Sequence, residues 1–316
     1  MNEPTAKRRF LRRRFVVFGS VMIVAAIAYH EFWMRRPVGE GPAGPSVDRS
    51  AFDSVWSDRP VRLIGIGDSI TRGFGAKNQS HSYFERLVKN PDDEFEQLRG
   101  CCLKSVLPAL QTKNIAISGS TSLEHVDHIA QRLEPFSESE YGIVVLTTGG
   151  NDIVHQYGRM PPREGAMYGA TFDEAQPWIE NFETRLEGML DSIRNLFPGG
   201  CEIYLADIYD PTDGVGDAPS VFLPEWKDGL AIHTAYNEVI RKTCQQNADV
   251  FLVPLHATFL GHGSHCRQFW RSTYDFADPH YWYFDNIEDP NDRGYDAIRR
   301  IFLNAICQNS RLASDK

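Results

Sequence analysis

The feature that most constrains the fold is a set of five short, almost uninterrupted apolar runs beyond residue 60. Strands that are covered on both faces of a parallel sheet have this composition, because neither face meets water. The runs span residues 61–67, 114–119, 143–148, 201–208 and 250–255. Since helix-like stretches separate them, they predict an α/β fold with an open, doubly wound parallel sheet.

The stretches between the runs carry apolar side chains at three- and four-residue spacing, which is typical of amphipathic helices. The longest stripe lies between residues 178 and 196, and we expect that helix to start at Pro177 and to end at Gly199-Gly200. A second helix is expected after a cap at residues 290–292, and a capping box is expected at Thr121. In such sheets the working residues lie at the carboxyl ends of the strands.

The N-terminal region has a different character, because a basic cluster precedes an apolar run at residues 15–29. This order predicts an export signal whose N-terminus stays in the cytoplasm. If the run extends to Arg35, it has about 20 residues and can span a membrane as an uncleaved anchor. The alternative is a signal peptide that is cleaved at Ala26-Ile27-Ala28. The anchor is the favoured form.

The chain is therefore expected to have four parts. Residues 1–36 form a basic tail with the anchor or signal peptide, and residues 37–60, rich in proline and glycine, form a linker. Residues 61–309 form the folded domain, and residues 310–316 form a tail.

Charge and cysteine content exclude some classes of protein. The net charge of −9 argues against general affinity for nucleic acid, which needs a cationic surface. The six cysteines show no C-x-x-C spacing of the metal-binding type, and outside the cytoplasm we expect one or two disulfides among them. A cluster of aspartates follows the fourth run without the spacing of a calcium loop, so a turn-rich loop is expected at Asp207, Asp210, Asp213 and Asp217.

Residues that could take part in catalysis lie at the ends of the first three apolar runs. The first run ends in Gly67-Asp68-Ser69, and a serine on a tight turn presents its hydroxyl at the edge of the sheet. The second run ends at Gly119, which offers an unobstructed backbone N–H, and the third run leads to Asn151, which offers a side-chain amide. Together with the Ser69 N–H, these donors can form an oxyanion hole.

These three segments, GDSIT, NIAISGSTS and TTGGND, resemble the first three sequence blocks of the GDSL, or SGNH, hydrolases. The resemblance extends over residues 62–306. It implies a flavodoxin-like three-layer fold and ester hydrolysis without a metal or organic cofactor. It also implies that Ser69 is the nucleophile and that Gly119 and Asn151 are oxyanion donors.

The fourth block departs from the family pattern D-x-x-H-P-N-x-x-G. Asp289 occupies the position of the histidine base, and Asn286 occupies that of the orienting aspartate. The ordinary pKa of a carboxylate lies far below neutral, which makes it a poor base for a serine hydroxyl. The sequence therefore predicts that another histidine serves as the base or that the site is inactive.

His280 is the favoured base, because the loop between the fifth run and the last helix has to pass over the site. The orienting acid is open between Asp278, Asp285 and Asp289, with Asp278 favoured by its proximity. His265 is the second candidate for the base, and the remaining candidates in this region are His256 and His262.

We therefore expect a serine ester hydrolase that acts outside the cytoplasm through an acyl-enzyme. Its expected substrates are small acyl esters or carbohydrate O-acyl esters, and its expected partners include the membrane through the N-terminal segment but no nucleic acid. Two alternatives remain open: an acyltransferase that passes the acyl group to a sugar hydroxyl, and a binding module that kept the fold but lost its base. If no histidine lies near Ser69, the binding module gains support.

Overall fold

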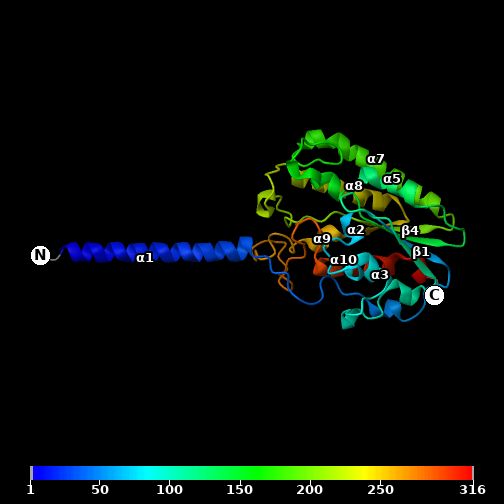
Figure 1. Cartoon of the computed structure of the whole chain (residues 1–316), viewed down its shortest axis with the longest axis horizontal. Coiled ribbons are helices and arrows are strands. Elements are labelled where there is room, and N and C mark those ends of the chain that lie inside the picture. Colours follow the sequence, from blue (N-terminus) through cyan, green and yellow to red (C-terminus); the bar gives the residue numbers. More distant parts are fainter. Residues whose placement is uncertain (1–2, 315–316) are drawn as a thin grey trace.

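The computed structural model describes residues 3–314, and the side chains of residues 13–313. A long helix, α1 (Glu3–Tyr29), leads away from a rounded domain that contains the rest of these residues (Figure 1). A five-stranded sheet lies inside the domain, with the strand order β2-β1-β3-β4-β5 and parallel pairing throughout. The strands are β1 (Val61–Ile66), β2 (Leu110–Asn114), β3 (Tyr141–Leu146), β4 (Cys201–Ala206) and β5 (Val250–Val253).

Helices cover both faces of the sheet, because successive side chains of a strand point to opposite sides and both sides are apolar. On one face, Ile64 and Ile66 of β1 belong to a core that also contains side chains of α5 (Ser122–Arg132), α7 (Phe172–Leu196) and α8 (Gly229–Gln246). On the other face, Leu63 belongs to a core with α3 (Tyr83–Val88) and α10 (Asp292–Asn309). The two helical layers lie above and below the sheet in Figure 1. The predicted doubly wound α/β fold is confirmed, and its strand order is the flavodoxin-like one.

The other elements are short helical turns, most of them in the loops that surround the sheet. They are η1 (His30–Met34), η2 (Arg49–Phe52), α2 (Ser69–Arg72), η3 (Gln79–His81), η4 (Glu96–Leu98), α4 (Leu103–Val106), α6 (Gly150–Val154), η5 (His155–Gly158), η6 (Ala218–Val221), α9 (Leu255–Phe259) and α11 (Arg311–Ser314).

Two element boundaries differ from the sequence prediction. The second strand ends at Asn114, where the predicted run begins, because β2 is an edge strand and its polar residues can face solvent. The predicted run still follows β1, since the N–H groups of Ile115 and Ile117 donate to the carbonyls of residues 65 and 67. Helix α7 begins at Phe172, five residues before Pro177, because Thr171 and Glu174 form a capping box there.

Residues 37–60 pack on the domain and do not form a free spacer. Ala43 and Trp56 are buried, and the Ala43 N–H donates to the carboxylate of Asp296 on α10 at 3.1 Å. Arg293, also on α10, donates to the carbonyls of Glu40 and Gly41. Polar groups at the start of α10 therefore bind the backbone of this segment, while its role as a linker stays a prediction.

All six cysteines are free. The expected disulfides are therefore not formed in this structure, and burial raises the pKa of the thiols of Cys201, Cys244, Cys266 and Cys307 to about 12.

Candidate active site

Ser69 lies directly after β1, at the N-terminus of the short helix α2. The turn that leads to it needs glycine at position 67, because Gly67 has a φ of +148° and a Cβ there would lie 2.2 Å from Oγ1 of Thr147. The Asp68 side chain accepts a hydrogen bond from the Ile70 N–H at 3.1 Å and so caps α2. These contacts hold Ser69 at the carboxyl end of the sheet, where it lines a cavity.

Asn151 lines the same cavity from α6, which follows β3. Its Nδ2 donates to the carbonyl of Ser120 at 2.9 Å, and the Ser120 hydroxyl donates to the carbonyl of Gly67 at 3.2 Å. These two bonds connect the ends of three neighbouring segments. Because an amide nitrogen has two hydrogens, Asn151 keeps a second N–H for a ligand in the cavity.

Gly119 lies on the loop after β2 with a φ of +81°, and a Cβ there would meet no atom within 4 Å. Its backbone therefore faces open space, although Gly119 is not among the residues that line the Ser69 cavity. The structure brings Ser69 and Asn151 to one cavity, and Gly119 precedes Ser120, whose carbonyl accepts the hydrogen bond from Asn151.

A second, mainly apolar cavity adjoins the first and shares a wall with it at Gly150, Val154, Ile208, Tyr209, Pro211 and Glu288. Its remaining wall is formed largely by apolar side chains, among them Tyr168, Val221, Leu223 and Trp226. Apolar walls beside a few polar groups are typical of sites for small molecules.

Asp289 follows Glu288, which lines the Ser69 cavity, although Asp289 is not itself among the lining residues. It is 3% exposed, and its Oδ2 accepts a hydrogen bond from Nδ2 of Asn286 at 2.6 Å. Its carboxylate is also close enough to Ser69 for hydrogen bonding between the two side chains to lower its pKa. Within the described residues, however, Oδ1 has no well-aligned hydrogen-bond partner. The two side chains are therefore near one another without a well-aligned hydrogen bond, as catalytic pairs often are without a ligand.

Three carboxyl groups surround Ser69, and burial is the main influence on each of them. Desolvation raises the pKa of Asp68 to about 7 and that of Glu288 to about 7, and the nearby Asp289 charge adds to both shifts. Desolvation also raises the pKa of Asp289, against the hydrogen bonds from Ser69 and Asn286. These groups hold protons at a higher pH than carboxyls in water do.

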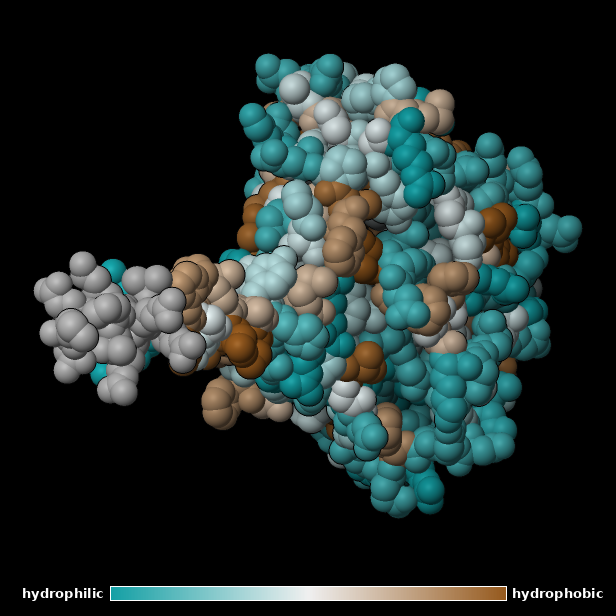
Figure 2. All heavy atoms as spheres, turned by 60° about the vertical axis from the view of Figure 1, so that its left-hand side comes forward, coloured by the Kyte–Doolittle hydropathy of each residue, from teal (hydrophilic) through white to brown (hydrophobic). Residues whose placement is uncertain are grey.

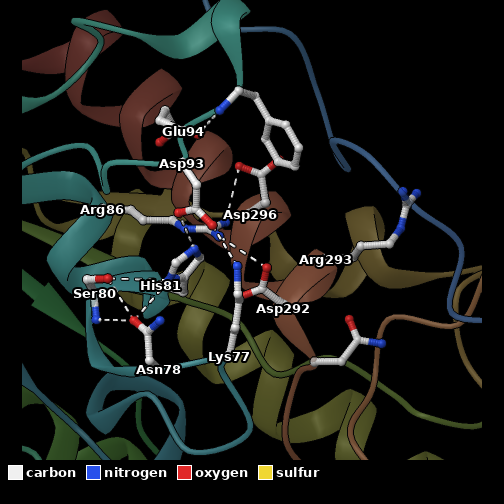
Figure 3. Close-up of polar contacts among 12 residues, drawn as sticks. Lys77, Asn78, Ser80, His81, Arg86, Asp93, Glu94, Asp292, Arg293 and Asp296 are labelled. Carbon is white, nitrogen blue, oxygen red and sulfur yellow. Dashed lines mark hydrogen bonds and ion pairs between the residues drawn. The ribbon is translucent and has the colours of Figure 1, made fainter.

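The segment that carries Asp289 is fixed by the start of α10. Asn291 caps this helix, and its Nδ2 donates to the carbonyls of Tyr281 and Tyr283 at 2.8 and 3.1 Å. Asp292 accepts a hydrogen bond from the buried Arg86 on α3 at 3.2 Å. Figure 3 shows Arg86 between the acidic side chains of α10, which hold the start of this helix against α3.

The predicted pair of His280 and Asp278 forms, but away from Ser69. Nδ1 of His280 lies 2.5 Å from Oδ1 of Asp278, and Asp278 also binds Arg293. The His280 ring packs against Gly39 of the N-terminal segment. His280 does not line the Ser69 cavity and its Nδ1 is engaged by Asp278, so the expected triad stays a prediction. The loop does pass near the site, but its histidine turns toward residues 37–41.

The other candidate histidines are engaged elsewhere. Nε2 of His265 pairs with Asp217 at 2.9 Å, and the ring of His262 stacks on Trp282 at 3.4 Å. His256 lies beside His233, with ring centroids 5.1 Å apart. Among the residues that the structure describes, no histidine lines the cavity beside Ser69.

Sequence reasoning missed Asp289 as the side chain that meets Ser69. The signal was its spacing, because it stands at the histidine position of the fourth block, and it was set aside because of the ordinary pKa of aspartate. The aspartate-rich loop after β4 is rich in turns, as expected: the Asp213 N–H donates to the carbonyl of Asp210 at 3.1 Å, and the Val215 N–H donates to that of Thr212 at 3.1 Å.

The chain is similar in sequence pattern to one protein family and in fold to several solved structures. A model of the GDSL-like lipase/acylhydrolase family matches residues 66–297, whereas no curated protein matches the chain. A lipase from a goat rumen metagenome is 15% identical, with a TM-score of 0.51 over 80% of this chain and 99% of that one. A phospholipase A1 from Streptomyces albidoflavus is 15% identical, with a TM-score of 0.49 over 80% and 100% of the two chains. An acetylxylan esterase from Geobacillus stearothermophilus is 19% identical, with a TM-score of 0.46 over 78% and 93%. At these identities the structural similarity shows the fold alone.

Proposed function

Because the chain belongs to the GDSL-like lipase/acylhydrolase family, we propose that it hydrolyses carboxylic esters with Ser69 as the nucleophile. The observation that carries this proposal is the meeting of Ser69 and Asn151, from the ends of two neighbouring strands, in one cavity. Acyl transfer needs a nucleophile within reach of the carbonyl carbon and a hydrogen-bond donor at the carbonyl oxygen, where the negative charge develops.

In the proposed reaction, Oγ of Ser69 attacks the ester carbonyl carbon and forms a tetrahedral intermediate. The free N–H of the Asn151 amide and the backbone N–H groups of Ser69 and Gly119 donate to the oxyanion. Loss of the alcohol leaves an acyl-enzyme, which water then hydrolyses to release the acid. No step of this scheme requires a metal or an organic cofactor.

The proposed substrates are small acyl esters or carbohydrate O-acyl esters. The apolar cavity that adjoins Ser69 supports binding of the acyl part of such an ester. A carbohydrate acceptor can in principle replace water, so analysis of products with and without a sugar acceptor separates a hydrolase from an acyltransferase.

The proposed location is outside the cytoplasm, at the end of an uncleaved membrane anchor. The helix over Arg13–Met34 is long and apolar enough to cross a membrane, and its most apolar stretch is not buried against the domain. The helix end also contacts the domain, since Phe32 packs on Phe269 and Trp270 with ring centroids 5.7 and 5.1 Å apart. Figure 2 shows apolar side chains where α1 meets the domain. Aromatic side chains at this place suit the interface of a membrane. Secretion after cleavage at residues 26–28 is the alternative.

One observation favours a second candidate, a binding module without catalysis. In the described part of the chain no histidine lines the Ser69 cavity, and a histidine is the usual base for serine.

Hydrolysis of p-nitrophenyl acetate by the full chain tests the two candidates. Replacing Ser69→Ala is expected to lower kcat by at least about 10³-fold, because the members of a catalytic unit fail together. Ser192→Ala removes an exposed hydroxyl on α7 and serves as the matched control with unchanged turnover. If the wild-type protein shows no hydrolysis and a fluorophosphonate does not label it, the binding module is the better account.

A further inference from the structure

Among the described residues, no histidine lines the cavity that contains Ser69. Asp289, which stands at the histidine position of the fourth block, is nevertheless close to Ser69. We propose that Asp289 is the general base that takes the proton of Ser69, an inference that rests on the proposed ester hydrolysis.

The geometry singles out one oxygen of Asp289. Asn286 holds Oδ2 at 2.6 Å, and the Asp289 N–H donates back to Oδ1 of Asn286 at 3.2 Å, so the two side chains fix one another. Oδ1 of Asp289 is buried without a well-aligned partner among the described residues. A buried acceptor without a donor is costly, and the hydroxyl of Ser69 is the neighbouring group that can supply one.

The other acidic groups of the site are less well placed. Oδ1 of Asp68 already accepts from the Ile70 N–H and from Oγ1 of Thr147. Glu288 lines the cavity, but hydrogen bonding to Ser69 is not among the influences on its carboxyl group. Asp289 is the carboxylate that combines contact with Ser69 and a free oxygen.

The proton balance closes with Asp289 alone. As Oγ of Ser69 bonds to the ester carbon, its proton passes to Asp289, and the carbonyl electron pair moves to the oxygen near Asn151. When the ester C–O bond breaks, the leaving alkoxide takes that proton from Asp289. Water then gives a proton to Asp289 while it attacks the acyl carbon, and Oγ of Ser69 recovers the proton as the acid leaves.

The environment makes this carboxylate a stronger base than aspartate in water. Burial raises its pKa, and the charged or titratable groups that face it are Asp68 after β1, Glu288 in its own loop, Tyr209 after β4 and Tyr295 on α10. The charge of Asp289 raises the pKa of each of these four groups, so none of them is a cation that would stabilise its ionised form.

The test is steady-state hydrolysis of p-nitrophenyl acetate by the full chain across pH. Asp289→Asn keeps the shape of the side chain and removes the base, so kcat is expected to fall by at least about 10²-fold while KM changes little. Glu288→Gln, the adjacent carboxylate, is expected to cost less than about tenfold. Asp289→Asn within threefold of wild type overturns the proposal, as does a loss of about 10²-fold in His280→Ala.

A rescue variant separates a chemical role from a structural one. Asn286→Asp with Asp289→His restores the family's D-x-x-H pair, so we expect hydrolysis to return to within about tenfold of wild type. The acidic limb of the rate profile should move to about pH 6–7, the range of histidine. This double variant also decides the question if Asp289→Asn fails to fold, and a profile that does not move contradicts the proposal. If Ser69→Ala abolishes activity but Asp289→Asn turns over like wild type and the rate profile of the double variant does not move, the esterase stands and only the inference about Asp289 fails.

Discussion

The two halves of the site are built in different ways. The strand-end half presents Ser69 and Asn151 on tight turns that directly follow β1 and β3. The C-terminal half presents Asp289 at the end of a long irregular segment, residues 260–291, which is held by contacts with distant parts of the chain. In the proposed mechanism the position of the base is kept, while its chemical type differs from the family pattern.

The largest effect is expected in the strand-end half. Asn151→Asp has nearly the same shape but replaces the donor with an acceptor, so kcat should fall by about 10²–10³-fold. KM should change much less, because the lost interaction belongs to the transition state. Kinetics of the variant and of wild type on p-nitrophenyl acetate measure this effect.

An Asn151→Asp variant with wild-type kcat would remove Asn151 from the oxyanion hole. The difference between the strand-end half and the C-terminal half would then be smaller, because Ser69 would be the one proposed catalytic residue of the strand-end half.

The next effect concerns the anchoring of the C-terminal half. Asn291→Ala removes the cap of α10 and leaves the carbonyls of Tyr281 and Tyr283 without their donor. We expect a loss of about 2–3 kcal/mol in the free energy of unfolding and a lower kcat, because Asp289 loses its support. Chemical denaturation and kinetics of the full chain measure the two changes.

Thr171→Ala is the matched control, since it removes the cap of α7 outside the site. It should cost about 1 kcal/mol without a change in kcat. Equal losses of activity in both variants would show that kcat follows global stability and not the position of Asp289.

The smallest effect concerns Asp68, one of the three carboxyl groups around Ser69. Burial raises the pKa of Asp68 to about 7, so the native state binds a proton that the unfolded state releases above about pH 4. Stability contributed through this group therefore falls as the pH rises from about 4 to about 7. Asp68→Asn removes this dependence, so its melting temperature relative to wild type should rise between pH 5 and pH 8.

Each kcal/mol in this difference corresponds to roughly 2–4 °C for a domain of this size. Thermal melts of both proteins at the two pH values give the result. A difference in melting temperature that stays constant with pH would show that Asp68 is charged at both values.

The sequence predicted the sheet and the strand-end half because both depend on local patterns. Four of the apolar runs contain the observed strands β1, β3, β4 and β5 to within a few residues, and the glycine-rich turns carry Ser69 and Asn151 where expected. The edge strand β2 was displaced, because its residues 111–113 are polar and an edge strand needs no second apolar neighbour.

The C-terminal half was not predictable in the same way. The direction of His280 depends on its pairing with Asp278 and on packing against Gly39, which lies 241 residues earlier in the chain. Likewise, the raised pKa of Asp289 comes from burial, and spacing along the chain does not reveal burial. The block spacing alone identified Asp289 as the residue at the position of the base. The raised pKa of its carboxyl group could be inferred only from the tertiary structure.

The most direct test of the central claim is the rate and position of labelling by a fluorophosphonate, mapped by peptide mass spectrometry. The account predicts one adduct, on Ser69, with a labelling rate about 10²-fold lower in Asp289→Asn and no adduct in Ser69→Ala. An adduct on another residue, no adduct in the wild-type protein, or an unchanged rate in Asp289→Asn would contradict it.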